Sequence, residues 1–179
     1  GWMSLMEMWR PEICDGIRLT VGLDTIITGK MDDILKSQVS KLAVCTDPIY
    51  PDKICNAITL STPEFCEEFW GMWEGNEDKL IPESKLILEN AAPVASEMVL
   101  MRKYYGDSPR IDKVFPNRIL SYKVHVVENE PPVNKLKGES INVYEHRLAI
   151  LKRSSIVYFH GWPKPHHIAH QAWVQENWR

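Results

Sequence analysis

Short apolar runs rich in β-branched residues alternate with helical stretches along the whole 179-residue chain, and this alternation constrains the fold more than any other feature. β-branched residues favour strands, whereas apolar side chains three and four positions apart favour helices. Strands are expected at residues 21–28, 41–45, 54–60, 119–127 and 156–159. Because strands and helices are interleaved in this way, the sequence predicts an α/β fold.

Helices are expected between these runs. Thr62 can cap a helix, Pro63 suits its first position and Glu64 its first turn. Residues 30–39 and 94–105 also have helical spacing, the second with Val99 or Leu100 toward the core. The aromatic residues after Glu64 have helical spacing too, and we interpret them as core residues: Phe65, Phe69, Trp70 and Trp73.

The composition is that of a globular protein, with 44% hydrophobic residues and a net charge of −3. At this length we expect a single domain over residues 1–179. No basic excess is present, which argues against binding to nucleic acid through its phosphates. The four cysteines are far apart and include no Cys-x-x-Cys pair, so we expect reduced thiols rather than disulfides or a zinc ribbon.

No apolar stretch approaches the roughly 18 residues that a transmembrane helix needs. Residues 1–10 lack the basic start and apolar core of a secretory signal, so we expect no membrane span and a cytoplasmic location. The chain opens at Gly1 with an apolar-rich helical pattern already in progress. We therefore expect a fragment or a processed chain.

The clearest chemical pattern is the run FHGWPKPH at residues 159–166, directly after an expected buried strand. In α/β proteins, ligands bind at this end of a strand. Gly161 permits close backbone approach, Lys164 offers a cation, and His160 can bind a divalent metal. This set suits an anionic phosphate ligand; the alternative is a rigid turn without a ligand.

A second candidate is Asp24, a carboxylate in the run GLDT at residues 22–25. It stands in an expected strand beside a glycine turn. An isolated Asp in such a place is commonly a turn or capping residue. The residues alone leave both interpretations of Asp24 open.

Five segments of the chain resemble, in the same order, bacterial and phage proteins identified as glycosyltransferases of the GT-A type. The segments are residues 2–10, 21–29, 120–124, 156–165 and 173–179. The C-terminal FHGWPKP is the most specific, because it is similar to the His-x-x-Gly-x-x-Lys-Pro signature of glycosyltransferase family eight in a compressed form. The resemblance implies a GT-A-like α/β fold, in which helices flank a mixed sheet.

The resemblance also implies an activity and a site. A metal-dependent enzyme of this family transfers a sugar from a nucleotide-diphosphate sugar to an acceptor, which is unknown here, with Mn²⁺ or Mg²⁺ as cofactor. Asp24 matches the second acid of the family's Asp-x-Asp motif, and His160 its metal-binding histidine. Gly161 and Lys164 match the residues that contact the diphosphate. Asp24 and Lys164 are therefore the expected catalytic residues.

The chain differs from the family at several positions, and these differences favour a protein that has lost catalytic activity. Gly22 replaces the first acid of Asp-x-Asp. Asn56-Ala57 stands where relatives have Asn-Ser, and Glu97-Met98 where many have Asp-Gln near the acceptor. Relatives also begin with a nucleotide-binding strand-helix-strand segment upstream, so we expect an N-terminal truncation. The alternative is a catalytically impaired relative that binds a nucleotide sugar or a carbohydrate.

Two groups of side chains near the C-terminus allow other interpretations. His166, His167 and His170 have the spacing of a zinc pair on a helix, which would fit a small zinc-binding interaction protein. The alternative is three surface histidines. Trp162, Trp173 and Trp178 pack the C-terminal tail onto the sheet, or one of them stacks on a sugar.

Overall fold

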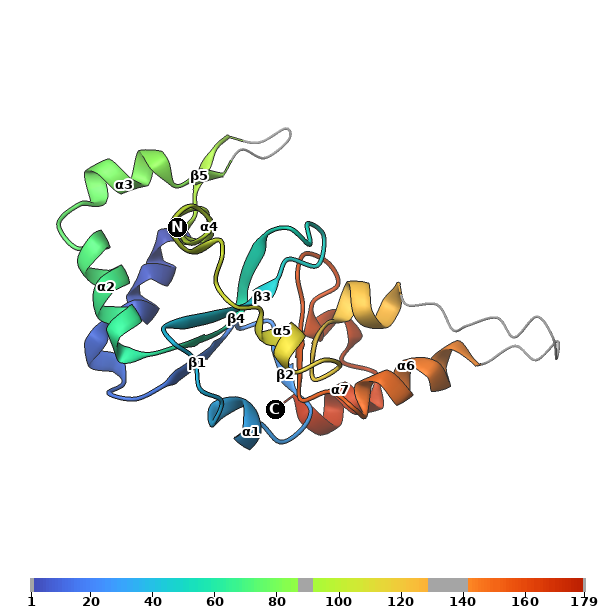
Figure 1. Ribbon diagram of the computed structural model, residues 1–179. Coiled ribbons are helices and arrows are strands. Elements are labelled where there is room, and N and C mark those ends of the chain that lie inside the picture. The colour runs from blue at the N-terminus through green and yellow to red at the C-terminus, as the bar shows by residue number, and fades with distance from the viewer. Residues whose placement is uncertain (1, 87–91, 129–141, 179) are drawn as a thin grey trace. The chain divides into compact units, whose positions relative to one another are not determined.

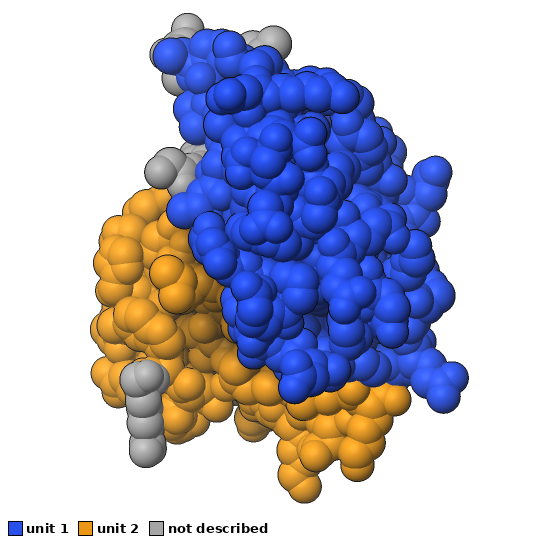
Figure 2. Space-filling model, turned by 90° about the vertical axis from the view of Figure 1, so that its left-hand side faces the viewer, with its two compact units in different colours: residues 1–20, 37–111 blue, residues 21–36, 112–179 orange. Residues whose placement is uncertain are grey.

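The computed structural model describes residues 2–86, 92–128 and 142–178, and it confirms a mixed α/β protein. The chain divides into two compact units, which Figure 2 colours blue and orange. Unit 1 comprises residues 1–20 and 37–111, and unit 2 comprises residues 21–36 and 112–179. A single domain over residues 1–179 stays a prediction.

Unit 1 contains a three-stranded sheet of order β1-β4-β3. Strands β3 and β4 are antiparallel, and their register changes between Val44, which pairs with Thr59, and Cys45, which pairs with Cys55. Both strands occur where the sequence predicts them. The bounds are β1 (Arg18–Val21), β3 (Leu42–Thr46) and β4 (Ile54–Ser61), with a small antiparallel pair β5 (Lys85–Leu86) and β6 (Val94–Ala95).

Helices cover the rest of unit 1 (Figure 1). Helix α2 starts as the sequence predicts, because the Thr62 side chain accepts a hydrogen bond from the Phe65 backbone N–H at 3.3 Å and Pro63 takes the first position. The bounds are η1 (Trp2–Trp9), η2 (Pro11–Ile13), α2 (Pro63–Trp73), α3 (Glu77–Glu83) and α4 (Glu97–Tyr105). Helix α5 (Ile111–Val114) begins with the last residue of unit 1, and its other residues belong to unit 2.

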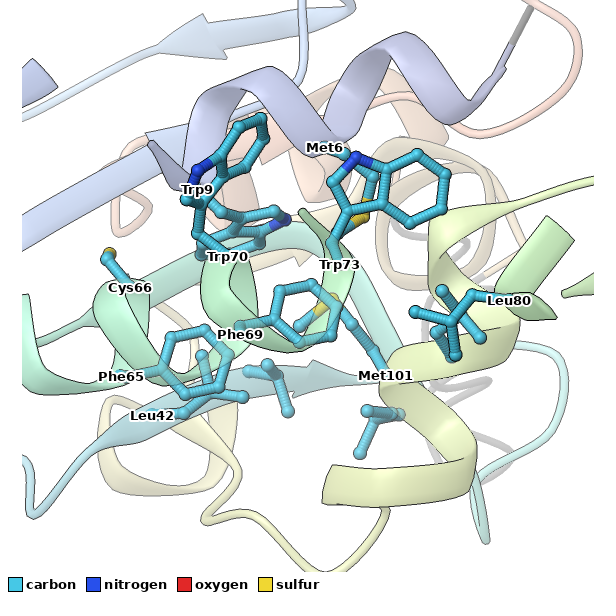
Figure 3. Close-up of a cluster of buried hydrophobic side chains, with 13 residues drawn as sticks. Met6, Trp9, Leu42, Phe65, Cys66, Phe69, Trp70, Trp73, Leu80 and Met101 are labelled. Carbon is cyan, nitrogen blue, oxygen red and sulfur yellow. The ribbon is translucent and has the colours of Figure 1, made fainter. Parts of the chain in front are cut away.

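The aromatic residues of α2 form the core of unit 1 (Figure 3). Trp9 of η1 is fully buried. Its ring packs in T-shaped geometry against Phe65 and Phe69, at centroid distances of 5.3 and 5.7 Å. Trp70 and Trp73 are each 8% exposed. The prediction that this aromatic pattern packs the core is confirmed. Cys45 and Cys66 are buried, and the four cysteines, all in the described part of the chain, form no disulfide with one another.

Unit 2 contains a second three-stranded sheet, of order β2-β8-β7. The buried strand β8 lies in the middle, antiparallel to β2 and parallel to β7. The sequence predicts β8 correctly. The bounds are β2 (Thr25–Ile27), α1 (Asp32–Leu35), β7 (Ile119–Ser121), the π-helical segment η3 (Tyr122–Val127), α6 (Val143–Leu151), β8 (Ile156–Tyr158), η4 (Pro165–Ile168) and α7 (Ala172–Asn177).

The single strand expected at residues 21–28 is wrong. Strand β1 ends at Val21, β2 begins at Thr25, and a bend at residues 22–24 separates them. β1 pairs in the sheet of unit 1, whereas β2 pairs with β8 in unit 2. One continuous strand cannot serve two separate sheets, so the chain bends at Leu23 and Asp24, and Asp24 lies outside both strands.

Three other expected elements need correction. The strand expected at residues 119–127 ends at Ser121, whose side chain accepts a hydrogen bond from the Val124 N–H at 3.4 Å and so starts η3. The helix expected at residues 94–105 begins only at Glu97, because Val94–Ala95 pairs with β5. Its Leu100 is fully buried. The helix expected at residues 30–39 is reduced to α1.

Candidate functional site

Asp24 lies in the bend that precedes β2, and the backbone ties this bend to the end of β8. The Asp24 carbonyl oxygen accepts a hydrogen bond from the Phe159 N–H at 2.8 Å. Phe159 is the first residue after β8, and His160 follows it directly. Two segments that are far apart in the sequence therefore meet at one edge of the unit 2 sheet.

The loop after β8 is anchored at both ends. Phe159 and Pro165 are buried, and Pro165 starts η4. Gly161 has a φ of +64°, in the left-handed region that side chains other than glycine rarely adopt. A Cβ at Gly161 would meet no atom within 4 Å, so the space above its backbone is open. This geometry suits the close backbone approach expected at Gly161.

Lys164 and Asp24 form an ion pair. Its partners lie 140 positions apart in the sequence, and their side chains are 30% and 45% exposed. The Lys164 backbone N–H also donates to His167 Nδ1 at 2.9 Å, which fixes the start of η4. The structure therefore brings together the two residues expected to be catalytic, and it joins them to each other.

Ser121 positions the ring of His160. Its hydroxyl lies 3.0 Å from His160 Nδ1, and Ser121 is the last residue of β7. Because β7 and β8 are parallel, Ser121 and His160 lie at the same edge, at the carboxyl ends of both strands. Ser121 was not predicted from the sequence as a residue of the site. Its place at the end of a strand beside the buried strand β8 is the signal that could have identified it.

Two side chains of the site, Asp24 and His160, are the candidate ligands for Mn²⁺ or Mg²⁺. Asp24 offers a carboxylate and His160 an imidazole, both acceptable to Mn²⁺. Within residues 2–86, 92–128 and 142–178, no group of three or more His, Cys, Asp and Glu side chains could hold a metal ion. Two protein ligands fit a metal ion that takes its remaining oxygens from a diphosphate and water.

The Asp24 and Lys164 side chains are partly exposed, and the residues of the site do not line the best-formed cavity of unit 2. A cavity of about 440 Å³ does exist in unit 2, with Tyr144, Leu148 and Trp173 among its lining residues. None of Asp24, His160, Gly161 and Lys164 is among the residues that line it. The site is therefore defined by contacts between its own residues.

Two side chains that the sequence singled out, Asn56 and Glu97, meet in unit 1. The Asn56 side-chain amide donates to a carboxylate oxygen of Glu97. Glu97 is 1% exposed, and burial raises the pKa of its carboxyl from the ordinary 4.5 to about 7, against the opposing effect of the Asn56 hydrogen bond. No local pattern in the sequence predicts that this carboxyl is buried.

Two of the three histidines near the C-terminus, His166 and His167, lie side by side. The rings of His166 and His167 are 4.0 Å apart between centroids. As stated above, the described part of the chain gathers no third ligand around them. The described residues therefore contain no cluster of ligands that would support the zinc-binding alternative.

No protein-family model matches the chain, and no curated protein matches it. Among the described residues, no helix is both long and apolar enough to cross a membrane. Fold and contacts define a mixed α/β chain with an Asp–Lys ion pair and a positioned imidazole at the carboxyl end of a parallel strand pair.

Proposed function

We propose that the chain is a metal-dependent glycosyltransferase of the GT-A type, similar to family eight, that transfers a sugar from a nucleotide-diphosphate sugar to an acceptor. The observation that carries the proposal is the Asp24–Lys164 ion pair, which joins the bend before β2 to the loop after β8. Ligands of α/β proteins bind at this edge of the sheet. The resemblance of the sequence to the family supplies the reaction.

The residues of the site suit the charges of this reaction. The bond between the sugar's anomeric carbon and the diphosphate oxygen breaks, and a bond to the acceptor oxygen forms as the acceptor hydroxyl gives up its proton to the departing diphosphate or to water. Negative charge develops on the departing diphosphate. Lys164 would stabilise that charge, and the open backbone at Gly161 would let the diphosphate approach. Asp24 and His160 would hold the Mn²⁺ or Mg²⁺, which supplies Lewis-acid stabilisation of the same charge.

The ion pair makes binding of metal and donor interdependent. While Lys164 neutralises Asp24, a cation alone must displace an ammonium group, and a diphosphate alone must leave the Asp24 carboxylate without a counter-charge. When the metal ion and the diphosphate bind together, Asp24 exchanges the Lys164 ammonium for the metal ion. Lys164 exchanges the Asp24 carboxylate for the diphosphate. We therefore expect nucleotide and metal to bind cooperatively.

A second candidate function rests on Gly22. The bend before β2 carries Asp24 but has glycine where the family has its first acid. With one carboxylate fewer, the site would bind a nucleotide sugar or a carbohydrate without turning it over. Release of free sugar or transfer to an added acceptor distinguishes the enzyme from this binding relative.

Thermal unfolding with UDP, GDP and their sugars, each with and without Mn²⁺, tests the proposal. A ligand that binds only the folded state adds about 2.7 kcal/mol at 100 times its dissociation constant, which shifts the unfolding midpoint measurably. We expect a shift that needs both nucleotide and Mn²⁺ and that is lost in His160→Ala. His170→Ala is the matched control, because His170 is exposed in the same unit. No shift with any nucleotide would overturn the proposal.

A further inference from the structure

Trp162 is the most exposed of the tryptophans whose side chains the structure describes. Its exposed fraction is 72%, against 40% for Trp178. The other described tryptophans, Trp9, Trp70, Trp73 and Trp173, are at most 8% exposed and serve the cores of the two units. Trp162 therefore contributes little to packing in the described structure.

The loop holds Trp162 next to the candidate site. Gly161, with its positive φ, precedes it, and Lys164, which is bound to Asp24, follows two positions later. The Lys164 N–H donates to His167, whose ring lies 5.8 Å from the Trp162 ring at an interplanar angle of 44°. The backbone on both sides of Trp162 is thus constrained, while most of the indole surface is open.

An exposed indole face attracts a particular kind of ligand surface. The ring face is electron-rich, so it favours polarised C–H groups, and its large area favours a flat apolar partner. The less polar face of a pyranose ring has both properties. A nucleobase is also flat, but in a nucleotide sugar the ribose separates it from the diphosphate, whereas the sugar is bonded to the diphosphate directly.

We infer that Trp162 is a specificity-determining residue that stacks on the sugar of the nucleotide-sugar donor. The inference rests on the proposed function, in which Gly161 and Lys164 contact the diphosphate on either side of Trp162. The group nearest to Trp162 is then the sugar. His167 supports the indole from the side and leaves its remaining surface for this contact.

The test measures dissociation constants by calorimetry with Mn²⁺ for two matched pairs of probes, UDP with UDP-glucose and GDP with GDP-mannose. In Trp162→Ala we expect binding of the preferred nucleotide sugar to weaken about five- to tenfold, the range of an aromatic stacking contact. Binding of the bare nucleotide diphosphate stays unchanged. Trp162→Phe retains a ring and most of the affinity. Trp178→Ala, which removes the other exposed tryptophan of unit 2, has no effect.

Each other outcome overturns the inference in a recognisable way. Unchanged affinity for the nucleotide sugar in Trp162→Ala would remove the stacking role and leave the proposed function intact. Equal weakening of nucleotide diphosphate and nucleotide sugar would assign Trp162 to another part of the donor. If the parent chain binds none of the four probes, the proposed function fails and this inference fails with it.

Fluorescence gives an independent readout of the same contact. Stacking of a sugar on Trp162 should protect the indole from quenching by acrylamide when UDP-glucose or GDP-mannose is bound. The protection should disappear in Trp162→Phe, although that variant still binds. Protection that persists in Trp162→Phe would mean that another tryptophan reports the binding, and would contradict the assignment.

Discussion

At the scale of single residues, the Asp24–Lys164 ion pair makes each side chain a competitor of the ligands proposed for the other. Both side chains are partly exposed. Exposed ion pairs contribute only about 0–1 kcal/mol to stability. Breaking this pair therefore costs little, and ligands of higher charge can replace it.

The variant Lys164→Ala tests this competition. Loss of the ammonium group should weaken binding of UDP or GDP with Mn²⁺ about ten- to hundredfold, the range of a hydrogen bond to a charged group. Binding of Mn²⁺ alone should instead become tighter, because Asp24 no longer has a competing cation. Calorimetric titrations measure both effects, and Lys152→Ala, at an exposed position of the same unit, is the control. Unchanged affinity for the nucleotide diphosphate would contradict the role of Lys164.

Glu97 gives a second prediction at this scale, since its pKa is raised to about 7 from the ordinary 4.5. Between these two pH values the folded chain keeps a proton that the unfolded chain releases. The contribution of Glu97 to stability is therefore complete below pH 4.5 and is lost as the pH rises to about 7. The loss is on the order of 3 kcal/mol.

Urea unfolding at a series of pH values measures this effect as the difference between the parent and Glu97→Gln. Glutamine keeps an oxygen for Asn56 but has no carboxyl to ionise, so the variant should gain stability over the parent as the pH rises. Glu67→Gln, at an exposed position in the same unit, is the control. Parallel curves for the parent and Glu97→Gln would show that this carboxyl does not titrate with a raised pKa.

At the scale of elements, α2 depends on its first turn. Thr62→Ala removes the side-chain acceptor of the Phe65 N–H and should cost about 1 kcal/mol of unfolding free energy. Thr62→Ser keeps the hydroxyl and should cost less. Chemical denaturation measures both variants. A loss in Thr62→Ser as large as that in Thr62→Ala would show that the methyl group of Thr62, and not its hydroxyl, supports the helix.

Helices and strands could be predicted from the sequence where a local pattern determines them by itself. Thr62 and Pro63 predict the start of α2, and β-branched runs predict β3, β4 and β8. The single strand predicted at residues 21–28 was wrong, because a strand pattern does not reveal with which sheet each half of the run pairs. The run at residues 119–127 misled because the Ser121 side chain starts a helical segment.

The candidate site could be predicted only in part. The sequence identified the individual candidate residues, which are Asp24, His160, Gly161 and Lys164. The structure brings two of them, Asp24 and Lys164, together in an ion pair. Their ion pair depends on the pairing of β2 with β8, which no local pattern contains. Ser121 and the contact between Asn56 and Glu97 were missed for the same reason, since each joins segments distant in sequence.

At the scale of the whole molecule, all four residues assigned to the proposed site belong to unit 2. We therefore expect UDP or GDP with Mn²⁺ to slow amide hydrogen exchange in β2, in β8 and in the loop that follows β8. Exchange in β3, β4 and α2 of unit 1 should not change. Mass-spectrometric exchange measurements resolve these peptides. Protection confined to α2 and the β3–β4 pair would place the ligand elsewhere.

The pairing of β2 with β8 also has a consequence for the order in which the chain can fold during its synthesis. β2 has β8 as its neighbour in the sheet, and β8 follows β2, β3, β4 and β7 along the chain. The sheet of unit 1 is complete in the sequence by Ser61, and can form while later segments are still being made. Asp24 leaves the ribosome early but acquires Phe159 and Lys164 as partners only after β8 has emerged. A translation product that stops before β8 would contain the aromatic core of unit 1 and, of the four residues assigned to the site, Asp24 alone, without the partners that hold it.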